Sequence, residues 1–150
     1  MAVASLDRYR ERLGRLQAWM AAEDLDWLLV PASDAHLNEY LPDAWKRRDW
    51  LCGFTGSAGD LLVGRETAWL FADSRYHEQA GREVPNDRVQ VAKLGLPGVA
   101  TLAETLESSL KAGSSIRLGF DPLTLSAATI QPFERCLVPK GLVLVPLAHN

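Results

Sequence analysis

Two apolar runs in the middle of the chain read Asp60-Leu61-Leu62-Val63 and Thr67-Ala68-Trp69-Leu70-Phe71, and Gly64-Arg65-Glu66 separates them. Both runs contain the branched and aromatic residues that favour extended backbone. A three-residue link that contains glycine can reverse the chain between two strands, but it is too short for a crossover. The sequence therefore predicts that these runs pair as neighbouring antiparallel strands.

Helical and extended patterns alternate on either side of this hairpin. Apolar residues recur every three or four positions over residues 6–20, which predicts an amphipathic helix capped by Ser5 or Asp7. Further helices are expected at residues 74–82, 99–111 and 123–136, and further strands at residues 27–30, 88–93, 116–120 and 142–146. We therefore expect one α/β domain over residues 1–150, with a mixed sheet of about six strands flanked by helices.

The composition limits the classes of partner. The chain has 150 residues, a net charge of -3 and one short basic run, Lys46-Arg47-Arg48, so it lacks the basic face that binds nucleic acid. It shows neither a leader sequence nor the run of about 20 apolar residues that spans a bilayer. Cys52 and Cys136 stand far apart and are expected to be reduced thiols. We expect a soluble cytoplasmic protein that binds neither nucleic acid nor membrane.

Gly53, Gly56 and Gly59 recur at a spacing of three residues. Glycines let a loop approach a phosphate, but the Gly-Lys-Ser/Thr ending of a P-loop is missing and a strand is expected to follow. Ser57 is not the nucleophile of a Gly-x-Ser-x-Gly elbow, because Thr55 stands where that motif has glycine. We favour a structural loop whose glycines supply positive φ or close packing, with positive φ as the working assignment at Gly56.

The three histidines, His36, His77 and His149, show no metal-binding pattern. None belongs to a His-Glu-x-x-His pair or to a cluster with cysteine. Acidic residues lie near His36, but a polar loop in which Asp34 or Ser33 makes a local turn bond explains this segment better. We therefore expect neither a metal ion nor a catalytic residue in the chain.

Other polar and aromatic residues allow a structural or a functional interpretation. Asp73-Ser74 stands between an expected strand and an expected helix, where it can cap the helix. Arg75 can bind a carboxylate and Tyr76 offers a hydroxyl, although a structural ion pair is the simpler role for the arginine. Trp45 and Trp50 are expected to be partly buried packing residues, or to lie at a contact surface.

Three short motifs follow one another in the chain: Asp34-Ala35-His36-Leu37-Asn38-Glu39-Tyr40, Gly53-Phe54-Thr55-Gly56-Ser57-Ala58-Gly59 and Ala72-Asp73-Ser74-Arg75-Tyr76. In this order they resemble the amino-terminal domain of the three-domain aminopeptidase P enzymes, which are Xaa-Pro aminopeptidases of the creatinase/prolidase group. Residues 7–20 and 117–122 are similar to the opening helix and the Gly-x-Asp-Pro segment of that family, so the resemblance spans nearly the whole chain.

The resemblance implies that the chain is the non-catalytic front end of a longer metallopeptidase. Members of the family hydrolyse the bond between an amino-terminal residue and a following proline. They use two divalent metal ions, manganese or zinc, in a pita-bread domain that no part of this chain resembles. The domain would shape substrate access or support a homo-oligomer. Its partners would be the catalytic domain of the same protein and a peptide with proline at the second position. A rim or interface position is implied for Asp34, His36, Tyr40, Arg48, Arg75 and Tyr76.

Two alternatives stay open at this point. A stand-alone binding or scaffold module can use the same fold without a peptidase attached, or the parent enzyme can be a prolidase or a creatinase. The polypeptide beyond Asn150 discriminates between them, because a peptidase needs a further domain with a set of Asp, His and Glu metal ligands.

Overall fold

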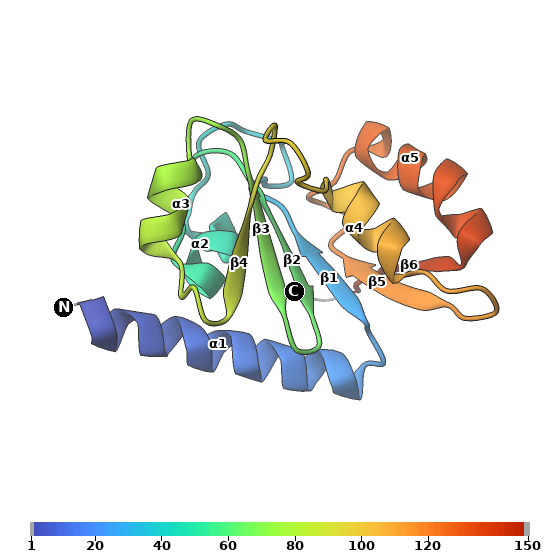
Figure 1. The fold of residues 1–150 in the computed structure, drawn as a ribbon, viewed down its shortest axis with the longest axis horizontal. Helices are drawn as coiled ribbons and strands as arrows, with labels where there is room; N and C mark the ends of the chain where they lie inside the picture. The colour runs from blue at the N-terminus through green and yellow to red at the C-terminus, as the bar shows by residue number, and fades with distance from the viewer. Residues whose placement is uncertain (1, 149–150) are drawn as a thin grey trace.

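The computed structural model describes residues 2–148, in which a six-stranded sheet lies between two layers of helices (Figure 1). The strands are β1 (Trp27–Val30), β2 (Asp60–Gly64), β3 (Ala68–Ala72), β4 (Val89–Lys93), β5 (Ile116–Phe120) and β6 (Leu142–Pro146). The helices are α1 (Ala2–Ala22), α2 (Arg47–Cys52), α3 (His77–Glu83), α4 (Leu102–Ser109) and α5 (Ala127–Cys136), with 3-10 turns at Asp43–Trp45 and Val138–Lys140. The expected α/β fold with a mixed sheet is confirmed.

The strand order is β4-β3-β2-β1-β5-β6, and within the described chain β2 alone runs against the others. The hairpin pairs Asp60 with Phe71 and Val63 with Ala68, as the short link predicts. β1 has the antiparallel β2 on one side and the parallel β5 on the other. Because all these strands except β2 run in one direction, their carboxyl ends reach the same edge of the sheet, which is also the edge where β2 begins.

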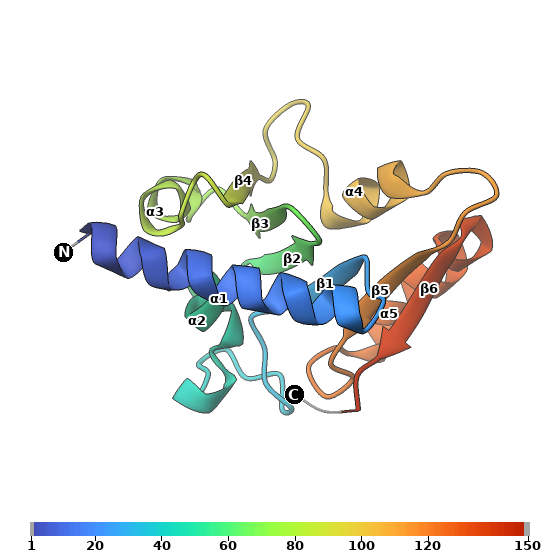
Figure 2. The same cartoon turned by 90° about the horizontal axis from the view of Figure 1, so that it is seen from below.

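The two faces of the sheet carry separate cores. α1, α2 and α3 contribute to the core on one face, and α4 and α5 contribute to the core on the other (Figure 2). Successive residues of β1 alternate between them, because Leu28 and Val30 belong to the first core and Leu29 to the second. Burial on both faces explains why β1 is a continuous apolar run rather than an alternating one.

α1 is 21 residues long and packs on the sheet through the fully buried Leu13 and Met20. It begins at Ala2, so Ser5 and Asp7 lie within the helix and the expectation that one of them caps it is wrong. The apolar period begins only at residue 6, but the residues before it include two alanines, which extend a helix readily. Among the described residues no helix is both long and apolar enough to cross a membrane.

Polar bonds fix the position of α1 on the sheet. The buried Gln17 amide donates to the carbonyl oxygen of Gly64, 2.9 Å away, at the end of β2. Its oxygen accepts a bond of 2.8 Å from Arg88, just before β4. Arg10 makes a paired contact with both carboxylate oxygens of Asp87. The helix is therefore held by the hairpin turn and by the segment that leads into β4.

We predict that Leu13→Ala lowers the free energy of unfolding by about 2–5 kcal/mol, because it leaves a cavity where α1 meets the sheet. Guanidinium chloride unfolding measures this change. The control is Glu11→Ala, an exposed site on the same helix, which is expected to change stability by less than about 0.5 kcal/mol. Equal midpoints for the two variants would contradict the packing of α1 described above.

Candidate functional site

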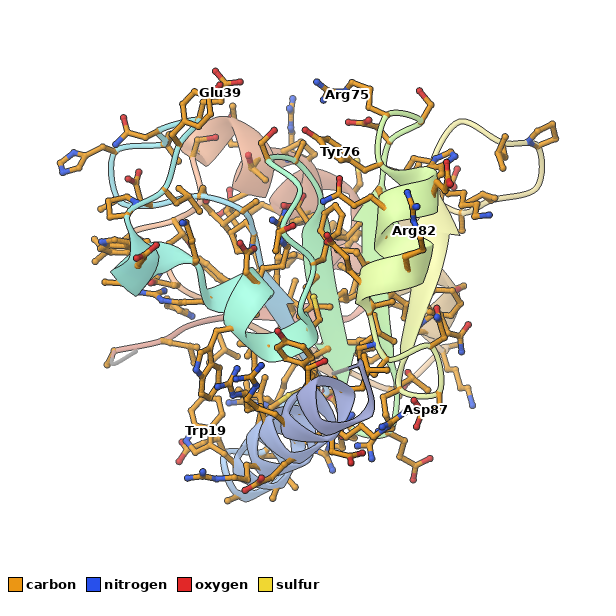
Figure 3. All side chains as sticks on the ribbon, turned by 90° about the vertical axis from the view of Figure 1, so that its left-hand side faces the viewer. Trp19, Glu39, Arg75, Tyr76, Arg82 and Asp87 are labelled. Carbon is orange, nitrogen blue, oxygen red and sulfur yellow. The ribbon has the colours of Figure 1, made fainter. Side chains whose placement is uncertain are left out.

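The three sequence motifs meet at one edge of the sheet. Residues 34–40 follow β1, residues 73–76 follow β3, and residues 53–59 lead into β2, which begins at the edge where those two strands end. We call this region the motif edge. Figure 3 shows Glu39, Arg75 and Tyr76 at this end of the molecule, with Trp19 and Asp87 at the opposite end. Segments that are separate in the sequence thus form a common surface.

The first loop is organised around a buried carboxylate. Asp34 is 2% exposed, and its Oδ1 accepts bonds from the backbone N–H groups of His36 at 2.9 Å and Asn38 at 3.0 Å. Its Oδ2 accepts a 2.9 Å bond from the Asn38 side chain. These bonds, with the one from the Asn38 backbone as the largest cause, lower the pKa of Asp34. The expected local turn is confirmed, and it leaves His36 and Tyr40 exposed at the surface.

The second loop is held from inside by Arg48, which lies on α2 and is 3% exposed. Its guanidinium donates to three backbone carbonyl oxygens, those of Phe54, Gly56 and Gly59. It also forms a 2.8 Å ion pair with Asp49 and lies 4.7 Å from the centre of the Phe54 ring. Arg48 was expected at a rim or interface, but its side chain is engaged inside the loop. Nearby, burial raises the pKa of Asp60, and the positive charge of Arg48 opposes that rise.

The three glycines of this loop serve different needs. Gly53 and Gly59 have φ values of 83° and 126°, which favour glycine. The φ of Gly56 is not positive, so the positive φ expected at this glycine is wrong. A Cβ at Gly56 would overlap the Phe54 ring and lie 2.8 Å from Cδ1 of Tyr76. Gly56 is therefore required for space, because these two rings close over it.

The third motif forms a turn. Oδ1 of Asp73 accepts a 3.0 Å bond from the backbone N–H of Arg75, and Oδ2 forms a 2.8 Å ion pair with the Arg75 guanidinium. The favoured ion pair is thus present, although the Arg75 side chain is 68% exposed, and a pair this exposed adds little stability. α3 begins only at His77, and its N-cap Tyr76 makes no side-chain capping bond, so the capping role expected for Asp73-Ser74 is wrong.

Two acidic residues interact with the motifs: Glu39, which belongs to the first motif, and Glu83, which the sequence did not single out. Glu83 of α3 accepts bonds from the Thr55 backbone at 2.8 Å and from the Thr55 hydroxyl at 3.0 Å, which ties the second loop to α3. The hydrogen bond from Arg75 to Asp73 raises the pKa of Arg75, and the negative charge of Glu39 in the first loop raises it further. No local pattern marks Glu83, because it meets Thr55 only when the fold brings α3 beside the second loop.

Ser57 and Cys52, two side chains with nucleophilic atoms near the motif edge, are held in structural surroundings. The hydroxyl oxygens of Ser57 and Tyr76 are 2.6 Å apart in a hydrogen bond between the second and third motifs. Burial raises the pKa of the Cys52 thiol to about 11, so it stays protonated and unreactive near neutral pH. The Ser57 and Tyr76 hydroxyls therefore join two of the motifs to one another, and the buried Cys52 thiol is not activated.

The donor set also does not fit a metal centre. Within residues 2–148 no group of three or more His, Cys, Asp or Glu side chains is placed to hold a metal ion. The Asp34 oxygens accept the N–H groups of their own loop, and His77 Nε2 lies 3.0 Å from the carbonyl oxygen of Ala72. His149, the third histidine considered above, lies outside the described residues. We therefore derive no metal-dependent step from this chain.

Comparison with known proteins identifies a common domain. A family model described as the creatinase/prolidase N-terminal domain matches residues 12–148. A probable Xaa-Pro aminopeptidase P of Laccaria bicolor is 35% identical over 140 residues, which are 93% of this chain and 21% of that protein. The chain thus spans about a fifth of the length of the curated relatives it matches.

Solved structures agree with this similarity. An X-prolyl aminopeptidase of Caenorhabditis elegans, described as a cytosolic enzyme with a di-nuclear active site, superposes with a TM-score of 0.86 at 30% identity. The match covers 95% of this chain and 24% of that enzyme. The N-terminal domain of the peptidase PepQ of Mycobacterium tuberculosis superposes with a TM-score of 0.63 at 27% identity, covering 91% of this chain and 92% of that domain.

We predict that Gly56→Val lowers the free energy of unfolding by about 1–3 kcal/mol, because its side chain cannot fit against Phe54 and Tyr76 without displacing them. Chemical denaturation measures the loss. Gly14→Ala is the matched control, since nothing lies within 4 Å of a Cβ at that helical position. It is expected to leave stability unchanged or to raise it by about 0.4–1 kcal/mol. Equal effects of both substitutions would contradict the close packing at Gly56.

The lowered pKa of Asp34 predicts an acid-sensitive first loop. A carboxylate whose folded pKa is depressed contributes stability above its unfolded pKa of about 3.9, and this contribution is lost as pH falls through the lower folded value. Asp34→Asn is therefore expected to be less stable than the parent near pH 7, with a gap that closes as the pH falls below about 4. Unfolding curves measured from pH 7 to pH 3 test this. Glu66→Gln, in the exposed hairpin turn, is the control, and a gap that does not change with pH would exclude the assignment.

Proposed function

Because the chain belongs to the creatinase/prolidase N-terminal domain family, we propose that it is the non-catalytic amino-terminal domain of a longer Xaa-Pro aminopeptidase. In this proposal the parent protein releases an amino-terminal residue that precedes proline. Two divalent metal ions, manganese or zinc, would be held by polypeptide outside this chain, in a catalytic domain of the same protein. The site of action is cytoplasmic, as described for the enzyme of Caenorhabditis elegans.

One observation carries the proposal. The match to the Caenorhabditis elegans X-prolyl aminopeptidase covers 95% of this chain at a TM-score of 0.86, yet it covers 24% of that enzyme. The probable Xaa-Pro aminopeptidases P repeat this relation, since the chain accounts for 21% of their length. A domain of this kind therefore occurs in these relatives as one part of a much longer polypeptide.

The proposed role of the domain is to shape the substrate entrance with the motif edge. Tyr40 is 81% exposed and Arg75 is 68% exposed, and both project from loops that are fixed from behind. The carboxylate of Asp34 fixes the loop that carries Tyr40, and the carboxylate of Asp73 fixes the turn that carries Arg75. A rim built in this way presents a cation, an aromatic ring and the exposed His36 without moving, as selection of substrates by length requires.

The alternatives differ in what is attached to the domain. A stand-alone binding module would use the motif edge for a partner without hydrolysis, and a prolidase or creatinase parent would accept another substrate. A homo-oligomer, which we also propose as a partner state, is compatible with each of them. Assays of the full-length protein on an Xaa-Pro tripeptide and an Xaa-Pro dipeptide separate aminopeptidase from prolidase.

We predict that the double variant Tyr40→Ala and Arg75→Ala of the full-length protein widens the entrance. The ratio of kcat/KM for an Xaa-Pro pentapeptide to that for Arg-Pro-Pro is expected to rise about three- to tenfold, because truncation removes the steric limit on longer peptides. The change should arise mainly in KM, since neither side chain is assigned a part in bond cleavage. Steady-state kinetics on both peptides measure the ratio.

Arg82→Ala is the matched control. Its side chain is 70% exposed, as Arg75 is 68% exposed, but it lies on α3 and pairs with Glu78. This control is expected to leave the ratio unchanged. The 150-residue chain alone, as a second control, should cleave neither peptide. An unchanged ratio in the double variant would remove the rim role, and a full-length protein that cleaves no Xaa-Pro peptide would remove the proposed activity.

A further inference from the structure

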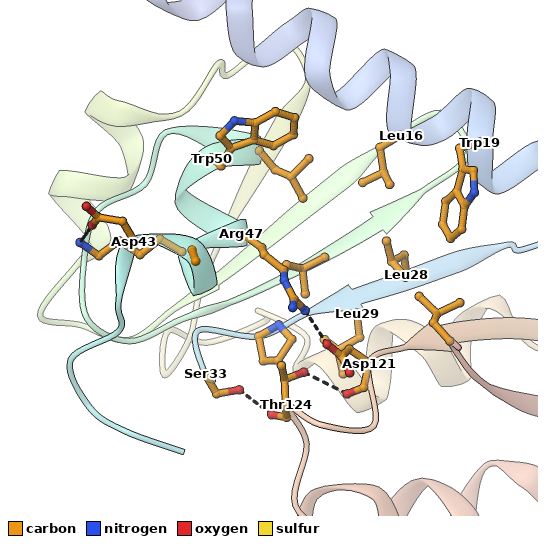
Figure 4. Close-up of a pocket in the computed structure, with 16 residues that line it drawn as sticks. Leu16, Trp19, Leu28, Leu29, Ser33, Asp43, Arg47, Trp50, Asp121 and Thr124 are labelled. Carbon is orange, nitrogen blue, oxygen red and sulfur yellow. Dashed lines mark hydrogen bonds and ion pairs between the residues drawn. The ribbon is translucent and has the colours of Figure 1, made fainter. Parts of the chain in front are cut away.

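An apolar groove of about 540 Å³ lies between α1, α2 and the carboxyl ends of β1 and β5 (Figure 4). Its apolar wall includes Leu16, Leu28, Leu29, Val30, Leu51 and Leu147. A groove of this size and composition is in the range of sites that bind an apolar group or a segment of polypeptide. Its residues come from separate parts of the chain, and none belongs to the three short motifs at residues 34–40, 53–59 and 72–76.

The groove lies where the connections of the sheet diverge. After β1 the chain leads to α2 on one face, and after β5 it leads to α5 on the other. Crevices at such a point, outside the carboxyl ends of neighbouring parallel strands, are the common binding places of open α/β sheets. Arg47 of α2 and Asp121 after β5 form an ion pair across this crevice. The pair fixes the two sides of the groove relative to one another.

Aromatic side chains at the groove are left uncovered. Trp19 is 38% exposed and Trp50 is 53% exposed, and both line the groove. The guanidinium of Arg12 lies 4.2 Å from the centre of the Trp50 ring. Tryptophan and arginine are the residues most enriched at the energetic centres of protein interfaces. Exposed tryptophans beside an apolar wall therefore indicate a surface that another polypeptide covers.

The course of the described chain indicates which polypeptide this is. The backbone N–H of Leu147 donates to the carbonyl oxygen of Phe120 at 2.9 Å, which fastens the last described turn beside the end of β5. The Leu147 side chain itself lines the groove. In the relatives that contain a domain of this kind the polypeptide is several times longer. A segment that follows Leu147 thus starts beside the groove, at a high effective concentration.

We propose that the groove receives an apolar segment of the same polypeptide, from the part that follows residue 150 in the full-length protein. This inference rests on the proposed function, since it requires the longer protein. The docked segment covers Trp19 and Trp50 and holds the next domain in a fixed orientation, so that the motif edge keeps a constant position relative to it. Neither a second copy of this chain nor a small apolar ligand is the occupant in this proposal.

Hydroxyl-radical footprinting of the full-length protein and of the 150-residue chain tests the proposal. Oxidation of Trp19 and Trp50 is expected to fall several-fold in the full-length protein. Leu96 and Val138, which are 49% and 43% exposed and do not line the groove, serve as internal controls and should be oxidised equally in both proteins. Equal oxidation of the two tryptophans in both proteins would overturn the proposal.

A substitution gives a second readout. Trp50→Glu in the full-length protein is expected to speed proteolysis at the junction after residue 150 by roughly tenfold, which corresponds to a loss of about 1.4 kcal/mol of docking free energy. Val138→Glu is the matched control and should leave the cleavage rate unchanged. Circular dichroism confirms that both variants are folded. A junction that is cleaved equally in Trp50→Glu and in the control would count against docking at this groove.

The outcomes separate this inference from the proposed function. Protection of the tryptophans in a full-length protein that cleaves no Xaa-Pro peptide supports docking and overturns the proposed activity. Cleavage of Xaa-Pro peptides by a full-length protein whose tryptophans are not protected supports the proposed activity and overturns docking. Protection that develops in the 150-residue chain alone as its concentration rises identifies a second copy as the occupant, and protection on addition of a short apolar compound to that chain identifies a ligand site. Either of these last results overturns the docking proposal.

Discussion

The motif edge depends on the hydrogen bonds that the buried guanidinium of Arg48 donates to the second loop. This guanidinium places a permanent positive charge inside a loop and satisfies it with the carbonyl oxygens of Phe54, Gly56 and Gly59 and with the carboxylate of Asp49. Buried charges are costly unless every donor finds an acceptor, so the loop must adopt the one course that directs its carbonyls inward. That course delivers the chain to the start of β2, between β1 and β3. The third motif then attaches to this loop through Ser57 and Tyr76, and α3 attaches to it through Thr55 and Glu83.

The strands could be predicted from the sequence because their signals are local. β1 is an apolar run that ends at a proline, and the hairpin is two such runs with a link too short for anything but a reversal. The conformation of single loop residues could not be predicted in this way. Gly56 has ordinary φ and is needed because the rings of Phe54 and Tyr76 close over it, and Tyr76 arrives from a segment beyond the hairpin. Asp73 turns its carboxylate to Arg75 rather than to the start of α3, a choice that the residue types alone leave open.

The candidate sites likewise include parts that the sequence predicts and parts that depend on the folded structure. The motifs could be recognised in the sequence, but their meeting at one edge follows from the direction of β2, which the hairpin implies only once β1 and β3 are known to flank it. Arg48 has the side chain of a surface residue, and its burial follows from the inward carbonyls of a loop that starts several residues later. The groove beside Trp50 could not be predicted, because its wall is assembled from α1, β1, α2 and the segment after β5.

The pairing of β1 with β5 also determines the order in which the two cores can form during synthesis. Asp26, just before β1, accepts the backbone N–H of Arg117 from 91 residues further along the chain, while β2 and β3 pair through a short turn. On a ribosome the strands from β1 to β4 emerge first and can close one core with α1, α2 and α3, whereas the free side of β1 must wait for β5. Until then the second face of the sheet, with Leu29 and Leu62, lacks α4 and α5. The nascent chain therefore passes through a stage with an open strand edge and an uncovered apolar face, the kind of surface that chaperones shield during synthesis.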